Sequence, residues 1–92
     1  MADAQRLRIE GRVQGVGYRD WLTRRARAAG LRGWVRNRID GSVEALLIGD
    51  TGPVEDVIAA CRQGPRMAAV TAVQRNADQD DGSKDFRQKP TV

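Results

Sequence analysis

The sequence predicts an α+β fold in which two helices cover one face of an antiparallel sheet of four to five strands. Three observations lead to this prediction. Short segments in which polar and apolar residues alternate, as in half-buried strands, recur along the chain. Two longer segments carry apolar residues at helical spacing, and strand-like segments flank both of them. The chain has 92 residues, a length at which one domain buries roughly 60–65% of its unfolded surface. We therefore expect a single domain over residues 1–92.

In the first half of the chain, a strand and a helix precede a hairpin. The predicted elements are a strand over residues 6–10, a helix over residues 18–29, and two strands over residues 33–37 and 42–48. Asp20 suits the positive N-terminal end of this helix, and Gly30 is a common helix stop. The pair Asp40-Gly41 predicts the tight turn of the hairpin.

In the second half, a helix precedes one or two strands. Gly52-Pro53 predicts the helix start, because proline fits a first helical position, and Glu55 and Asp56 favour that end. Gly64-Pro65 ends the helix. Its apolar residues fall on one stripe: Val54, Val57, Ile58 and Cys61. The remaining predicted elements are a strand over residues 68–73, a polar loop over residues 76–85 and a short last strand from Phe86. The order βαββαβ is that of a ferredoxin-like sandwich.

The segment between the first strand and the first helix is the most informative part of the chain. It reads Gly11-Arg12-Val13-Gln14-Gly15-Val16-Gly17-Tyr18-Arg19. Glycines permit a tight loop whose backbone N–H groups turn toward one point, and the helix N-terminus adds partial positive charge. The expected amide donors are Val13, Gln14, Gly15, Val16, Gly17 and Tyr18. Arg19, in the first helical turn, can bind a phosphate through two parallel N–H groups. We predict that this segment binds phosphate.

The glycine pattern does not fit a nucleotide-binding loop. A Walker A loop ends in Gly-Lys-Ser/Thr, whereas Gly17 is followed by Tyr18-Arg19. The glycine spacing also differs from Gly-x-Gly-x-x-Gly, and no acidic residue near position 35 is available to hold a ribose. The loop is therefore expected to bind a single phosphoryl group.

The residue types limit the chemistry at such a site. The chain has no histidine, so no general acid is evident that would assist the poor alkoxide leaving group of a phosphate ester. A carboxyl phosphate expels a carboxylate whose conjugate acid has a pKa of about 4, and it needs no such acid. Asn37 can accept and donate hydrogen bonds and can hold a water in line with the phosphorus. These features favour an acyl phosphate substrate.

Two ordered motifs resemble one known family. Gly11-Arg12-Val13-Gln14-Gly15-Val16-Gly17-Tyr18-Arg19, followed by Gly33-Trp34-Val35-Arg36-Asn37, is similar to the acylphosphatase family. The resemblance continues through Gly64-Pro65, Val70 and Val73. It implies a single acylphosphatase-like domain over residues 1–92, with a fifth strand added to the ferredoxin-like sheet. It also implies that Arg19 binds phosphate and that Asn37 orients the attacking water. The implied substrates are acyl phosphates such as acetyl phosphate, carbamoyl phosphate or 1,3-bisphosphoglycerate, and inorganic phosphate or sulfate is the implied ligand.

Composition sets further expectations. Residues 1–38 carry ten arginines against three acidic residues, a net charge of +7, whereas residues 39–92 carry six basic and nine acidic residues, a net charge of −3. The positive half holds the loop and should attract small anions. Cys61 is the only cysteine, which suits a reducing cytoplasm. Scattered acidic residues and the missing histidine predict no metal and no cofactor. No apolar stretch approaches a membrane span of ~20 residues. We expect a monomer with no membrane partner.

The sequence alone leaves three alternative functions open. An arginine-rich ferredoxin-like domain can bind RNA, although the expected strands lack the paired aromatics that stack bases, so no nucleic-acid partner is expected. An acylphosphatase-like domain can handle carbamoyl phosphate at the head of a longer maturation protein, whereas this chain stops at Val92. A degenerate member can bind phosphate without turnover. Gln88 stands where an apolar residue is expected and Pro90 cannot donate to a strand ladder, so the last strand is expected to be short, frayed or absent.

Overall fold

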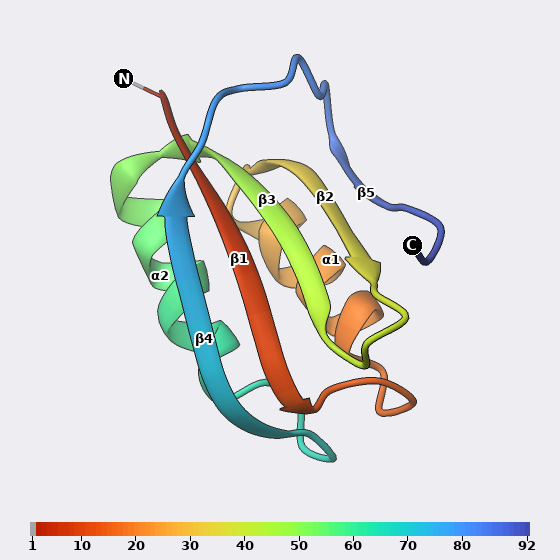
Figure 1. Ribbon diagram of the computed structural model, residues 1–92. Helices are drawn as coiled ribbons and strands as arrows, with labels where there is room; N and C mark the ends of the chain where they lie inside the picture. The colour runs from red at the N-terminus through yellow and green to blue at the C-terminus, as the bar shows by residue number, and fades with distance from the viewer. Residues whose placement is uncertain (1) are drawn as a thin grey trace.

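The computed structural model describes residues 2–92 as a five-stranded sheet with two helices packed against one of its faces (Figure 1). The elements, in chain order, are β1 (Ala2–Arg12), α1 (Tyr18–Ala28), β2 (Arg32–Asn37), β3 (Val43–Asp50), α2 (Thr51–Cys61), β4 (Ala69–Ala77) and β5 (Phe86–Gln88). The predicted ferredoxin-like α+β fold is confirmed. Neither helix in the described part of the chain has the length and apolar character needed to cross a membrane.

The sheet has the strand order β4-β1-β3-β2-β5 and is mixed. The first four strands pair antiparallel as expected, but β5 pairs parallel with β2, so the expectation of an antiparallel fifth strand is wrong. The reason is topological. β4 ends at the end of the sheet where β2 begins. The loop over residues 78–85 crosses that end from one side of the sheet to the other before β5 starts beside Gly33 (Figure 1).

Several elements begin or end away from their predicted bounds. β1 and β4 are longer than predicted. The start of β1 pairs with the end of β3, from Ala2↔Asp50 onward, and the end of β4 pairs with β1 as far as Gln5↔Ala77. Ladder hydrogen bonds join the backbones of these ends, whatever their side chains. α2 begins at Thr51, so Pro53 is its third residue and its first turn holds no acidic residue. The predicted roles of Pro53, Glu55 and Asp56 at the helix start are therefore wrong.

The core lies between the sheet and the two helices. The apolar stripe predicted for α2 is fully buried, together with Leu22 and Ala26 of α1 and the inward residues of β1 and β3. Burial raises the pKa of the Cys61 thiol to about 11, so the group is protonated at neutral pH and serves in packing. The buried hydroxyl of Tyr18 donates a hydrogen bond to the backbone carbonyl of Cys61 at 2.7 Å, which fixes the start of α1 against the end of α2.

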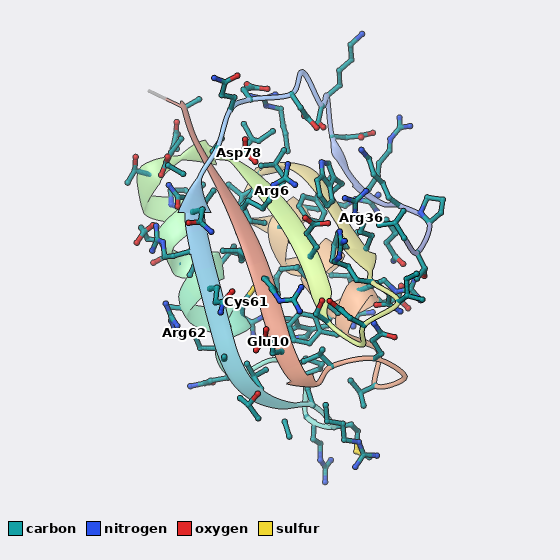
Figure 2. All side chains as sticks on the ribbon, viewed as in Figure 1. Arg6, Glu10, Arg36, Cys61, Arg62 and Asp78 are labelled. Atoms are coloured by element: carbon teal, nitrogen blue, oxygen red, sulfur yellow. The ribbon has the colours of Figure 1, made fainter. Side chains whose placement is uncertain are left out.

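The face of the sheet that the helices leave open carries an ion-pair cluster (Figure 2). Three guanidinium groups donate hydrogen bonds to the Glu44 carboxylate at 2.7–3.1 Å, those of Arg6, Arg36 and Arg38. Burial acts to raise the pKa of Glu44, but these hydrogen bonds and charges outweigh it and hold the pKa below its usual value. Arg6 also pairs with Asp78, as Figure 2 shows. Much of the positive charge of the N-terminal half is therefore compensated within the molecule.

Candidate active site

A small pocket lies between the loop that joins β1 to α1, the start of α1 and the ends of β2 and β5. It has a volume of about 110 Å³. Pockets for drug-sized ligands are several times larger, at roughly 300–1,000 Å³, so this one suits a small anion. Its lining residues are Val13, Gln14, Gly15, Gly17, Tyr18, Arg19, Asp20, Asn37 and Gln88. The pocket joins segments that are far apart in the sequence.

The loop depends on glycine at two positions. Gly15 and Gly17 have φ angles of 71° and 78°, in the left-handed region that favours glycine. Gly17 is also the N-cap residue of α1, and no side chain caps this helix start. The first N–H groups of a helix lack partners within the helix, and together with the helix dipole they bind anions. The partial positive charge at the start of α1 therefore lies at the pocket, which Gly17, Tyr18 and Arg19 line.

Arg19 is the second residue of α1 and lines the pocket. Within residues 2–92, no carboxylate forms an ion pair with its guanidinium group, although seven other arginines are paired. The hydroxyl of Thr23 donates to the Arg19 carbonyl at 2.7 Å, one turn further along the helix. A guanidinium without a protein partner at the mouth of an anion-sized pocket is available to a ligand.

Asn37 is the last residue of β2, and its side chain carries the most informative atom of the site. The atom Oδ1 is buried and has no hydrogen-bond partner, the only such side-chain atom among the described residues. Buried polar atoms are nearly always hydrogen-bonded, so a lone acceptor on a residue that lines a pocket indicates a missing donor such as a water or a ligand. The backbone of Asn37 is held by its pairing with Val43 and by a hydrogen bond that its carbonyl accepts from the Val92 N–H at 3.2 Å.

This chain is similar to known proteins in both sequence and fold. The sequence model of the family described as Acylphosphatase matches residues 5–88. An acylphosphatase from Acidiphilium cryptum is 56% identical over 70 residues, which are 76% of this chain and 77% of that protein. The crystal structure of acylphosphatase from Bacillus subtilis matches with a TM-score of 0.91 at 32% identity, covering 97% of this chain and 99% of that one. The chain belongs to the acylphosphatase family.

The enzyme is therefore a hydrolase, an acylphosphatase. A longer protein shares the fold. Full-length HypF, solved in a phosphate- and nucleotide-bound form, matches with a TM-score of 0.92 over 99% of this chain and 12% of its own. At 24% identity this likeness shows the fold alone.

The structure brings most of the sequence-predicted site residues of this acylphosphatase together. Arg19, Asn37 and five of the six loop residues line the same pocket. Val16 does not, because its side chain packs against the core. Asp20 and Gln88 line the pocket as well, and sequence reasoning did not place them there. The signal was present for Gln88, because a polar residue stood at a strand position that is expected to be apolar.

The side chain of Gln14 joins the loop to the β2–β3 hairpin. Its Nε2 donates to the backbone carbonyls of Arg38 and Ser42, at 2.7 and 2.8 Å. The hairpin is itself closed by Asp40, whose Oδ1 accepts from the hydroxyl and the backbone N–H of Ser42. The Ser42 hydrogen bonds, with the Arg8 guanidinium, hold the pKa of Asp40 well below its usual range. Gln14 thus fixes the distance between the loop and the strand that carries Asn37.

Gln14→Leu is expected to lower the free energy of unfolding by about 1–2 kcal/mol, because both hydrogen bonds are lost while each carbonyl keeps one backbone donor. Urea titration followed by tryptophan fluorescence measures this change. Gln74→Leu, at an exposed position of β4, is the matched control and should stay within about 0.5 kcal/mol of the wild type. Equal stability of the wild type and Gln14→Leu would show that other contacts join the loop to the hairpin.

The polar loop predicted over residues 76–85 spans residues 78–85 in the structure, because residues 76 and 77 belong to β4. Its carboxylates are engaged by side chains elsewhere in the protein. Asp80 pairs with Arg32, and Asp81 accepts hydrogen bonds from Ser83 and from the Trp34 ring N–H. The pKa values of both carboxyls lie below their usual value because of these hydrogen bonds. Among residues 2–92, no three His, Cys, Asp or Glu side chains gather where they could hold a metal ion.

Proposed function

We propose that this acylphosphatase hydrolyses the carboxyl-phosphate bond of acyl phosphates without a metal. The amides of the glycine-rich loop and Arg19 bind the phosphoryl group, and Asn37 orients the attacking water. The observation that carries this proposal is the buried, unpartnered Oδ1 of Asn37, a residue that lines the same pocket as Arg19. An acceptor in that place receives a hydrogen bond from a water, and its fixed strand holds that water beside the phosphate site.

The positive charge for phosphate binding comes from the loop and one side chain. Each charge-assisted hydrogen bond contributes about 1.5–3 kcal/mol, and a few of them give millimolar to micromolar affinity after the cost of association. A carboxylate in the place of Asn37 would repel the phosphate, whereas the neutral carboxamide does not. The leaving carboxylate needs no proton, and a phosphate oxygen takes the proton of the attacking water.

The substrate class follows from the small pocket. We propose small acyl phosphates, such as acetyl phosphate, carbamoyl phosphate or 1,3-bisphosphoglycerate, with inorganic phosphate as product and ligand and with no cofactor. We also propose that residues 1–92 act as a single domain and as a monomer. The single, buried cysteine suits a cytoplasmic location, where thiols stay reduced.

The RNA-binding alternative draws less support. The arginines of the open sheet face pair with Glu44 and with neighbouring acidic residues, which reduces the charge available to a polyanion. Trp34 on this face is covered by three cationic side chains, those of Arg6, Arg36 and Lys89, which leaves little of its ring for stacking a base.

The proposed reaction is tested by acetyl phosphate hydrolysis in the presence of EDTA. We expect release of inorganic phosphate at the same rate with and without the chelator. β-Glycerophosphate, an alkyl monoester, is the control substrate and should be hydrolysed at least about 100-fold more slowly, because the site offers no general acid for its alkoxide leaving group. Loss of acetyl phosphate hydrolysis in EDTA, or comparable rates for the two substrates, would contradict the proposal.

A further inference from the structure

Two side chains at the mouth of the pocket contact each other. Gln88, the last residue of β5, donates a hydrogen bond from Nε2 to Oδ1 of Asp20, in the first turn of α1. Both residues line the pocket together with Arg19. The contact links the edge strand to the helix whose N-terminus faces the pocket.

The strand register explains why a glutamine stands at this position. β5 pairs with β2 in the register Gly33↔Phe86 and Val35↔Gln88, so Gln88 lies on the same side of the sheet as buried Phe86. Apolar residues are expected on that side of the sheet, and Phe86 meets this expectation. At position 88 the side chain lies beyond the core, and its amide instead contacts the Asp20 carboxylate.

The Asp20 carboxylate has two opposing effects at this site. A carboxylate in the first turn stabilises α1 through the helix dipole. The same charge competes with a bound phosphate for the positive end of the helix and for the Arg19 guanidinium, which lines the same pocket. In the structure, Asp20 accepts a hydrogen bond from Gln88. The ion pairs within residues 2–92 do not include one between Asp20 and Arg19.

We propose that Gln88 is a positioning residue that holds the Asp20 carboxylate away from Arg19 and so leaves the guanidinium available for phosphate. The inference rests on the proposed role of Arg19 in binding phosphate. Without the amide donor of Gln88, the Asp20 carboxylate is free to pair with the Arg19 guanidinium, which lines the same pocket, and phosphate must then displace an internal ion pair before it binds.

The test compares Gln88→Met, Asp20→Asn and the double variant. Methionine keeps the length of the side chain but lacks the donor. For Gln88→Met we expect KM for acetyl phosphate and Ki for inorganic phosphate to rise about 3- to 10-fold, the size of a partly exposed ion pair, with kcat nearly unchanged. Asp20→Asn alone should leave both constants equal to the wild type or lower. In the double variant, both constants should return to the Asp20→Asn values, because no carboxylate remains to compete.

The rescue by Asp20→Asn separates this role from a structural one, because a defect in folding or in strand pairing would persist in the double variant. Gln88→Ala is a second test of the same donor and should behave like Gln88→Met. Gln79→Met, in the exposed loop before β5, is the matched control and should have no effect on either constant. Unchanged Ki for phosphate in both Gln88 variants, or a raised Ki that Asp20→Asn does not reverse, would overturn the inference. If the proposed function itself is wrong, the wild type will not hydrolyse acetyl phosphate, and this result differs from those that overturn the role of Gln88.

Discussion

Arg19→Ala is expected to reduce kcat/KM for acetyl phosphate by about 10²- to 10⁴-fold and to remove measurable binding of inorganic phosphate. The guanidinium supplies two charge-assisted hydrogen bonds to phosphoryl oxygens, each contributing about 1.5–3 kcal/mol, and each 1.4 kcal/mol corresponds to a tenfold change. Among residues 2–92, Arg19 is the only cationic side chain that lines the pocket, so no other takes its place. Initial-rate kinetics and calorimetric titration with phosphate measure the two effects.

Two further variants define what the side chain of Arg19 contributes. Arg24→Ala, at an exposed position of the same helix, removes the same charge from the molecule and should leave kcat/KM within about twofold of the wild type, since exposed charges are largely screened. Arg19→Lys keeps the charge but loses the planar pair of donors, and should fall between the wild type and Arg19→Ala. Retention of phosphate binding by Arg19→Ala would refute the assignment.

Asn37→Ala is expected to lower kcat by about 10²- to 10³-fold while Ki for inorganic phosphate stays within about twofold of the wild type. The variant removes Oδ1, the buried acceptor that we assign to the attacking water, but leaves Arg19 and the loop amides in place. The expected separation of kcat from phosphate binding is the signature of a group that orients the nucleophile.

The controls for Asn37 address charge and general structure. Asn37→Asp keeps the shape but adds a carboxylate, and we expect it to weaken phosphate binding as well as turnover, because like charges repel. Asn76→Ala, at an exposed position of β4, should behave as the wild type. Turnover at the wild-type rate by Asn37→Ala would show that the water is held by another group.

Much of the fold was predictable because its signals are local. The stripe of Val54, Val57, Ile58 and Cys61 predicted a buried helix face, and the pair Asp40-Gly41 predicted a turn; both are present in the structure. The glycine-rich loop was recognisable for the same reason, since Gly15 and Gly17 supply the left-handed backbone that the loop requires. The extents of β1 and β4 were less predictable, because their polar ends are ordered by ladder hydrogen bonds across the sheet.

The C-terminal tail shows the limit of pattern reading. Gln88 and Pro90 predicted a last strand that is short, frayed or absent. β5 is short, with three residues from Phe86, but the backbone continues to pair beyond it. The Lys89 N–H donates to the Val35 carbonyl at 2.9 Å, and the Val92 N–H donates to the Asn37 carbonyl at 3.2 Å. Pro90 lies between these two bonds, where its missing N–H costs no ladder hydrogen bond. The tail therefore supports the strand that carries Asn37.

By itself, the sequence determined the order of strands and helices, the phosphate-type loop and the family, because each depends on residue types at short spacing. Only the tertiary structure decided that Asn37 lines the same pocket as Arg19 with its Oδ1 buried and unpartnered, that Gln14 joins the loop to the hairpin, and that Gln88 contacts Asp20 across 68 positions. These arrangements depend on strand register and on the packing of α1 against the sheet. No short stretch of sequence encodes them, since each pairs groups that meet only when the whole chain folds.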